Sequence, residues 1–190
     1  MASLLTFVIY ALSIHPHITA KLREEVISIV PEGLPSFDQI REMKYRKSPS
    51  DGKTCLSSVS ERAPLSLVRA VINETLRLFP PIVMSGRAAK KSTLLPPDRT
   101  SGGKPIFVPG NETIVLFPLM LMQRRKDLWG EDADHFIPER WTDKDRVVES
   151  DSFTFLPFGT GPRTCLGQVS VCTMATTNQL FIYFPAEFCL

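Results

Sequence analysis

The sequence has too few cysteines, in the wrong spacing, for a zinc ribbon or a dense disulfide scaffold. Its 190 residues include four cysteines, and none of them forms a C-x-x-C pair of the kind that binds zinc in a ribbon. Four cysteines are also too sparse for a disulfide scaffold in a chain of this length. The sequence therefore excludes a small cross-linked domain, and each cysteine has to be judged by its surroundings.

Long hydrophobic runs and an excess of one charge are absent as well. The longest uncharged start, 1–14, is shorter than the about 20 residues of a membrane-spanning helix, and it has no positive leader or cleavage site of a signal peptide. A net charge of +2 without a dense lysine and arginine block gives no case for binding nucleic acid. We therefore expect the end of a buried helix at 1–14, and no membrane anchor in this chain.

Proline is the residue in excess. It occurs 16 times in 190 residues, whereas an average protein contains about 5%. So many prolines exclude a simple bundle of long helices and predict many turns and short segments. Apolar residues at 43% and charged residues at 22% are typical of a folded domain, and the length predicts a single domain with its own core.

The periodicity of apolar residues predicts several helices. Residues 4–14 are apolar on nearly every side, which is typical of a helix buried in a larger protein. A second helix should begin at Pro16 and end at Pro31, a short one is expected over 36–43, and the clearest covers 68–79. The second and the last helix have apolar stripes, formed by Ile18, Leu22, Val26 and Ile29 and by Val68, Ile72, Leu76 and Phe79.

From 82 to 122 the pattern changes to short strands. Residues 105–108 and 113–117 flank the turn-rich tetrapeptide 109–112, so we expect them to pair as a hairpin. Residues 46–64 are rich in serine, lysine and proline without any period, which predicts a long exposed loop. In 152–167, three glycines and two prolines lie among aromatic residues, which predicts a loop of defined shape.

That loop contains a cysteine in surroundings that suit metal binding. Cys165 lies two residues after Arg163, and a neighbouring positive charge favours the thiolate, the form of cysteine that ligates metals. Gly161 and Gly167 lack a Cβ and would let a flat group approach the backbone, while Phe158 could shield the sulfur from water. These are the needs of a haem held by one thiolate. The residues alone leave a purely structural cysteine open as the alternative.

Three motifs resemble those of the cytochrome P-450 family and occur in the family's order. Residues 158–167 (FGTGPRTCLG) match the haem-binding signature F-x-x-G-x-R-x-C-x-G at every fixed position. Residues 74–77 (ETLR) match its E-x-x-R motif, and 138–141 (PERW) match its P-E-R-F/W motif. The chain therefore resembles the C-terminal portion of a haem-thiolate monooxygenase. Residues 122–130 resemble the fungal branch that hydroxylates alkanes and fatty acids.

The resemblance implies roles for individual residues around the cofactor. Cys165 would be the axial iron ligand, and Arg87 and Arg163 would each be directed at a haem propionate. The residues that would shape the pocket of the sulfur are Phe158, Gly161, Arg163 and Gly167.

A structural ion network is implied as well. Glu74, Arg77 and Arg140 would form a partly buried network that holds the cysteine loop under the haem, a role that suits bidentate guanidinium–carboxylate contacts. Glu74 and Arg77 lie three apart on a helix, so a solvated surface pair is the simpler alternative.

The resemblance further implies a fold, a cofactor and partners. The fold would be mainly α with a small β layer, as an incomplete C-terminal part of the family's fold. The cofactor would be haem b (iron protoporphyrin IX), and the reaction would insert one oxygen atom from O2 into a C–H bond of a small apolar substrate. Electrons would come from an NADPH-dependent reductase. An intact member would lie on the cytosolic face of the endoplasmic reticulum membrane.

The sequence departs from the family in three respects. The likeness covers 2–45 and 68–168, whereas 46–67 is interpreted as an insert and 169–190 as an atypical tail, both consistent with translated intron or an error in the gene model. Members of the family are much longer, so the acidic and alcohol pair that handles protons would lie before Met1. We therefore expect the isolated chain to retain little haem and to have no turnover. A non-catalytic product of a pseudogene and a soluble thiol or metal-binding module are the alternatives.

Overall fold

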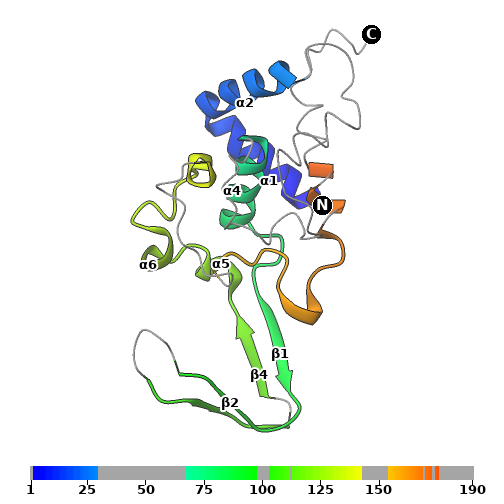
Figure 1. The fold of residues 1–190 in the computed structure, drawn as a ribbon, viewed down its shortest axis with the longest axis vertical. Coiled ribbons are helices and arrows are strands. Elements are labelled where there is room, and N and C mark those ends of the chain that lie inside the picture. The colour runs from blue at the N-terminus through cyan, green and yellow to red at the C-terminus, as the bar shows by residue number, and fades with distance from the viewer. Residues whose placement is uncertain are drawn as a thin grey trace, which may run out of the picture.

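A computed structural model describes residues 2–29, 67–97, 103–111, 113–142, 154–168, 170–172 and 174–175. These residues form a helix-rich body from which a ribbon of strands projects (Figure 1). The predicted fold class, mainly α with a small β layer, is confirmed. The predicted short helix at 36–43, the predicted loop at 46–64 and the tail beyond 175 lie outside the described residues, as does the predicted insert at 46–67 apart from Leu67.

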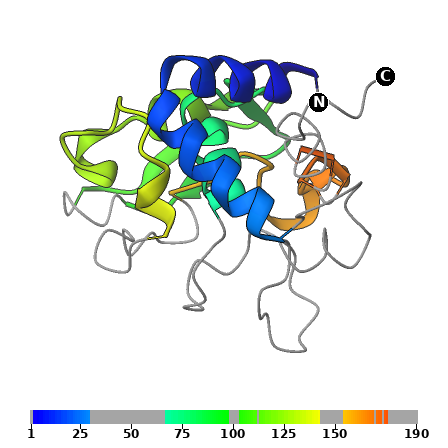
Figure 2. The ribbon, with the colours of Figure 1, turned by 90° about the horizontal axis from the view of Figure 1, so that it is seen from above.

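Three helices build the core of the body. They are α1 (Ala2–Ile14), α2 (Pro16–Ile29) and α4 (Leu67–Leu78). Helix α4 packs against both α1 and α2, and Figure 2 shows α1 and α2 meeting at a sharp bend of the chain beside it. The predicted stripe of α2 is buried at Ile18, Leu22 and Val26, and the side chain of Ile29 lies outside the description. Helix α4 buries the predicted Val68, Ile72 and Leu76, but it is buried on nearly every side rather than along one stripe, and Phe79 is half-buried just after the helix ends.

The strands are paired differently from the sequence prediction. Strand β1 (Ser85–Ala89) pairs antiparallel with β4 (Thr113–Phe117), and β2 (Thr93–Leu95) pairs antiparallel with β3 (Ile106–Val108). The predicted hairpin of 105–108 with 113–117 is therefore wrong. The two described pairs are nested along one ribbon, and residues 109–111 lie in a bend of it.

The contacts of Gly110 give the physical reason for this bend. The Gly110 N–H donates to Ser92 Oγ at 2.9 Å, and a Cβ at Gly110 would lie 2.7 Å from the Ser92 backbone nitrogen. Residues 109–111 therefore lie directly against the bend at 90–92. The chain between β3 and β4 is one residue longer than the chain between β1 and β2, as in a bulged ribbon. Turn residues favour a hairpin tip and a bend equally, so composition alone does not distinguish them.

Short helices follow the ribbon. They are α5 (Leu119–Met122), α6 (Lys126–Trp129), and the 3-10 turns η1 (Pro138–Trp141) and η2 (Gly161–Arg163). The 3-10 turn η1 packs against α4, so the two motifs 74–77 and 138–141 meet in space although they are far apart in the sequence.

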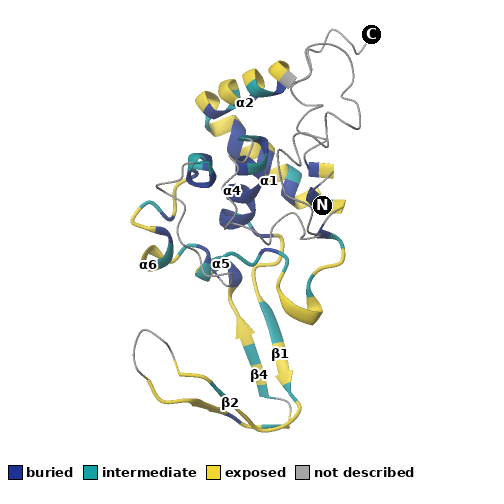
Figure 3. Cartoon of the chain, viewed as in Figure 1, coloured by how far each residue is buried: buried dark blue, intermediate teal, exposed yellow. Residues whose placement is uncertain are grey.

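Burial is concentrated in α4 and in the helix faces turned toward it, while the ribbon is largely exposed (Figure 3). Helix α1 buries one face through Leu4, Val8, Ala11 and Leu12, which is less than the nearly complete burial that its sequence predicts. Large apolar side chains are exposed on its other face, on the ribbon and just before it: Phe7, Ile9, Tyr10, Ile14, Ile82, Val83, Met84, Ile106, Phe107, Ile114, Leu116 and Phe117.

No single helix among the described residues has both the length and the apolar character needed to cross a membrane. Helices α1 and α2 meet the test together, but the chain bends by 112° between them.

Candidate functional site

Helix α4 carries a buried ion pair. The Arg77 Nε donates to Glu74 Oε2 at 2.9 Å, and Arg77 Nη2 donates to Glu74 Oε1 at 2.8 Å. Both side chains are fully buried. The contact is thus bidentate and shielded from water, which makes it stronger than a solvated pair at the same spacing.

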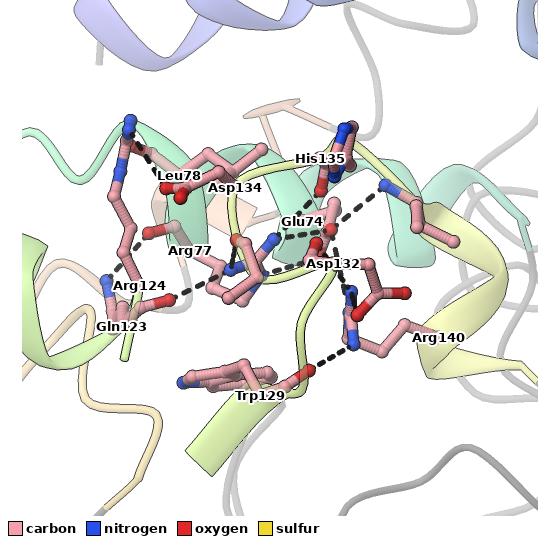
Figure 4. A network of polar contacts seen from close by, with 12 residues as sticks. Glu74, Arg77, Leu78, Gln123, Arg124, Trp129, Asp132, Asp134, His135 and Arg140 are labelled. Atoms are coloured by element: carbon pink, nitrogen blue, oxygen red, sulfur yellow. Dashed lines mark hydrogen bonds and ion pairs between the residues drawn. The ribbon is translucent and has the colours of Figure 1, made fainter. Parts of the chain in front are cut away.

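All five N–H groups of the Arg77 guanidinium have an acceptor. Two of them bond to Glu74, and the other three donate to backbone carbonyls of the segment between α5 and η1. Those bonds run from Nη1 to Gln123 O at 2.9 Å and Ala133 O at 2.6 Å, and from Nη2 to His135 O at 3.1 Å. A buried guanidinium needs this complete set of partners, and Figure 4 shows the carbonyls converging on it.

The Glu74 carboxylate accepts two further hydrogen bonds. The Ile137 backbone N–H donates to Oε1 at 3.0 Å, and the Trp141 Nε1 donates to Oε2 at 2.9 Å. Glu74 therefore fixes both the start and the end of η1 against α4.

Arg140 lies beside this pair but is held mainly by other groups. Its Nε is 3.8 Å from Glu74 Oε1, which is an ion pair without a hydrogen bond. Its Nη2 is 2.9 Å from Asp132 Oδ1, and its Nη1 donates to the Trp129 carbonyl at 2.7 Å. The structure thus brings Glu74, Arg77 and Arg140 together, and Asp132 is the carboxylate closest to Arg140.

Two tryptophans pack beside the network. The sequence marks Trp141 only as the last position of the P-E-R-W motif and predicts no role for either tryptophan. The Trp129 and Trp141 rings lie 5.7 Å apart, and the Arg77 guanidinium lies 5.1 Å from the centre of the Trp129 ring. Only Trp141 uses its indole N–H here, because Trp129 Nε1 is buried without a partner among the described residues.

This difference makes the two tryptophans a matched pair for mutation. Trp141→Phe removes a donor to a buried carboxylate, and we expect it to lower the free energy of unfolding by about 1–3 kcal/mol more than Trp129→Phe. Both changes replace an indole with a phenyl ring beside the network, and only Trp141→Phe removes a hydrogen bond. Urea denaturation followed by circular dichroism measures it. Equal losses in the two variants would contradict a structural role for the Trp141–Glu74 bond.

The cysteine loop is held in shape by its own backbone. The Cys165 N–H donates to Phe158 O at 3.0 Å, and the Thr164 N–H donates to Gly161 O at 3.0 Å. Gly159 and Gly161 have φ values of +69° and +75°, in the region that side chains disfavour. The structure thus requires Gly161 for its backbone conformation, and it adds Gly159, which the sequence motif leaves variable.

The same loop presents its thiol to solvent. Cys165 is exposed, and the neighbouring Leu166 side chain is fully exposed. A Cβ at Gly167 would lie 3.8 Å from Cys165 Sγ, which is an ordinary van der Waals contact, so Gly167 adjoins the sulfur without steric conflict. One accessible soft donor beside an uncovered apolar side chain fits a flat apolar group that is bound through a thiolate, as a haem would be.

Aromatic side chains connect the cysteine loop to the ion network. The Phe155 ring lies 4.7 Å from the Trp141 ring and 6.3 Å from the Trp129 ring. Phe155 and Phe158 are partly buried, and both pack against the core cluster that contains residues of α1 and α4. Movement of η1 away from Glu74 would therefore disturb the packing under the loop.

The two arginines predicted to face a cofactor are both exposed. Arg163 lies in η2, and Arg87 lies in β1 with its Nη1 donating to the neighbouring Gly86 carbonyl at 2.9 Å. The structure describes no contact between either of them and Cys165. The predicted metal role for Cys165 does not extend to a cluster, because no group of three metal-ligating side chains occurs in the described part of the chain.

An exposed ion pair links α2 to η1. Lys21 Nζ lies 3.1 Å from Glu139 Oε1. Partial burial raises the pKa of Glu139, but a backbone hydrogen bond and the contact with Lys21 outweigh it, so its pKa lies below the ordinary value. This contact therefore stabilises the fold above the ordinary carboxyl pKa and stops doing so as the pH falls.

We expect Lys21→Met to lower the free energy of unfolding at pH 7 by less than about 1 kcal/mol. The difference from the unchanged chain should shrink at a second, acidic pH, because the contribution is lost as the pH falls through the lowered pKa of Glu139 in the folded state. Urea denaturation at the two pH values measures it. A difference that persists at the lower pH would contradict an electrostatic contribution.

The sequence matches a family model over residues 52–175, described as Cytochrome P450. The chain belongs to the cytochrome P450 family. The match includes α4, η1 and the cysteine loop, so all three P450 motifs lie within it. The fold described above is thus part of a P450 fold.

Curated relatives support the same assignment. "Cytochrome P450 monooxygenase himC" of Aspergillus japonicus is 37% identical over 177 residues, which covers 92% of this chain and 26% of that protein. "Cytochrome P450 52-N1" of Starmerella bombicola is 32% identical over 192 residues, covering 98% and 32%. "Cytochrome P450 52A10" of Candida maltosa is 35% identical over 179 residues, covering 92% and 30%. The predicted likeness to fungal members is confirmed, and the chain spans about a quarter to a third of the length of these P450 relatives.

Proposed function

We propose that this chain is the cysteine-ligand portion of a haem-dependent monooxygenase that inserts one oxygen atom from O2 into a C–H bond of an apolar organic substrate. The observation that carries the proposal is the exposed thiol of Cys165 on a glycine-shaped loop that is packed against the E-x-x-R helix. Relatives named monooxygenases support the reaction class.

In this proposal Cys165 is the axial ligand of haem b. When bound, the haem would supply oxygen activation, for which a thiolate ligand favours cleavage of the O–O bond. The chain's own residues would hold the sulfur in place. The backbone bond between Cys165 and Phe158 fixes the direction of the loop, and the left-handed conformation of Gly161 completes its turn.

Charged residues of the chain would have two separate tasks. Arg163 and Arg87 are exposed cations that would bind the haem propionates. Glu74, Arg77 and Arg140 would carry no chemistry. They would keep η1 and the aromatic contacts under the loop in one arrangement, so that the thiolate approaches the iron from a fixed direction.

The remaining partners follow from the family. An NADPH-dependent reductase would supply electrons, and the substrate would be a small apolar molecule, with alkanes and fatty acids favoured by the likeness of 122–130 to a fungal branch. An intact protein would lie on the cytosolic face of the endoplasmic reticulum membrane. The chain has no feature that favours nucleic acid as a partner.

A chimera tests the haem-binding proposal. This chain replaces the matching part of the Aspergillus japonicus relative, and the purified product is analysed for metal and porphyrin. We expect iron and porphyrin in equal amounts. Zinc in place of iron would instead indicate a metal-binding module, and a folded product without metal would contradict a cofactor site. A second form of the chimera without 46–67 is expected to retain more haem, because we propose that this segment is an insert.

A second candidate is a truncated, catalytically incompetent product of a pseudogene or a mis-spliced gene model. The observation that favours it is the set of large apolar side chains that are exposed on α1 and along the ribbon. We expect the isolated chain, expressed with haem, to retain little of it. A thiolate-type absorption band from the isolated chain under carbon monoxide would contradict this candidate, and a spliced transcript that encodes 46–67 would contradict an intron origin for that segment.

A further inference from the structure

The C-terminal end of α4 lacks the usual backbone donors. The last four carbonyls of a helix have no partner within it, and a continuing chain supplies N–H groups four residues further on. For the carbonyls of Leu76 and Arg77 those positions are Pro80 and Pro81, and proline has no N–H. Leu76 and Arg77 are fully buried, so their carbonyls need donors from elsewhere in the chain.

The side chain of Gln123 supplies both donors. Its Nε2 donates to Leu76 O and to Arg77 O, at 3.2 Å in each case, and the side chain is fully buried. The two neighbouring carbonyls are satisfied separately, since Thr75 O accepts from the Phe79 N–H at 2.7 Å and Leu78 O accepts from Arg124 Nη2 at 2.7 Å. Figure 4 shows Gln123 and Arg124 side by side at this end of the helix.

The backbone of Gln123 bonds to the ion network as well. Its carbonyl accepts a hydrogen bond from Arg77 Nη1 at 2.9 Å. Gln123 therefore contacts Arg77 twice. Its side-chain amide donates to the Arg77 backbone carbonyl, and its backbone carbonyl accepts from the Arg77 guanidinium. The amide oxygen of Gln123 has no partner among the described residues, so the two N–H groups are the part of the side chain that is used here.

We propose that Gln123 is a positioning residue whose amide replaces the N–H groups missing at Pro80 and Pro81, and so fixes Arg77 in its network. The importance of this position for catalysis rests on the proposed function, since the network is expected to hold the Cys165 loop. The positioning itself depends only on the contacts of α4.

Hydrogen exchange of the full chain tests whether the Gln123 amide takes the place of the backbone N–H groups that are missing at Pro80 and Pro81. Gln123→Met keeps the length of the side chain and removes both donors. We expect amides in the last turn of α4 to exchange about tenfold faster in this variant. In a Pro80→Ala, Pro81→Ala background the backbone can supply its own donors, so Gln123→Met should change the exchange rates by less than about twofold. Gln168→Met, at a second buried glutamine, is the control and should leave α4 unchanged.

The Pro80→Ala, Pro81→Ala background separates hydrogen-bond donation by Gln123 from a contribution of its packing. Equal acceleration with and without the prolines would overturn the proposal, because Gln123 would then act only through packing. An unchanged rate in Gln123→Met, or an α4 without protected amides in the unchanged chain, would overturn it too. The experiment needs no haem, whereas the proposed function is tested by the iron content of the chimera, so the two proposals can fail independently.

Discussion

Replacing Arg77 with methionine is expected to lower the free energy of unfolding by about 3–5 kcal/mol. Methionine fills much of the same space but leaves the Glu74 carboxylate buried with no cation within hydrogen-bond distance. It also leaves the carbonyls of Gln123, Ala133 and His135 without the donor they share. The loss is large because Glu74, Gln123 and Ala133 are fully buried, so solvent cannot replace the guanidinium at these groups.

Lysine is not expected to rescue this position. An ammonium group has three donors from a single nitrogen, whereas the five acceptors around Arg77 are arranged for a planar guanidinium. The double variant Glu74→Leu, Arg77→Met should recover part of the loss, because it removes the buried carboxylate along with its hydrogen-bonded cation. Recovery in the double variant would show that burial of a carboxylate without that cation, and not lost packing, dominates the effect.

An exposed arginine provides the control for Arg77. Arg125 pairs with Asp127 at the surface, with more than half of both side chains exposed. We expect Arg125→Met to change the free energy of unfolding by less than about 1 kcal/mol. Urea denaturation followed by tryptophan fluorescence measures both variants, since Trp129 and Trp141 lie beside the network. Similar midpoints for Arg77→Met and Arg125→Met would contradict the structural role of the buried pair.

Replacing Cys165 with serine is expected to remove haem from the chimera described above. A serine hydroxyl is a poor ligand for haem iron compared with a thiolate, and the exposed loop offers no second soft donor in the described residues. Haem content, measured as porphyrin per protein after gel filtration, should fall to background. Retention of the full amount would show that Cys165 does not bind the iron.

Cys172 is the matched control for this change. It lies seven residues further along the chain, and it is buried rather than exposed. Cys172→Ser keeps the same chemical substitution close to the loop, so general damage by a serine should affect both variants. We expect it to leave the haem content of the chimera within about twofold of the unchanged form, because a buried thiol cannot reach a bound group.

The helices of this chain could be predicted from the sequence, and the strand pairing could not. The apolar stripe of α4 has the spacing of a helix, and the two prolines after it mark its end, so local patterns were sufficient. The ribbon depends on the contact of Gly110 with Ser92, which joins two bends that have the same turn chemistry as a hairpin tip. Pairing of strands is a tertiary property, and turn composition does not encode it.

In the candidate site, too, some residues could be predicted from the sequence and others could not. The motifs located Glu74, Arg77 and Cys165, because each is marked by residue type and spacing. Three of the five acceptors around Arg77 are backbone carbonyls, which leave no signature in the sequence. Asp132 as the close partner of Arg140 was likewise invisible until η1 was placed against α4.

Gln123 is the one missed residue that carried a usable signal. Two consecutive prolines directly after a buried helix remove two backbone donors, so a donor from elsewhere in the chain is required. That requirement can be stated from sequence alone. The identity of the donor could not, since Gln123 lies more than forty residues further on and meets α4 only through the fold.

Sulfur ligation by Cys165 is tested most directly by the absorption spectrum of the reduced chimera under carbon monoxide. We expect the Soret band of a thiolate-ligated haem in the unchanged chimera and in Cys172→Ser, and its loss in Cys165→Ser. A thiolate-type band that survives in Cys165→Ser, or a band of another ligand type in the unchanged chimera, would contradict Cys165 as the axial ligand.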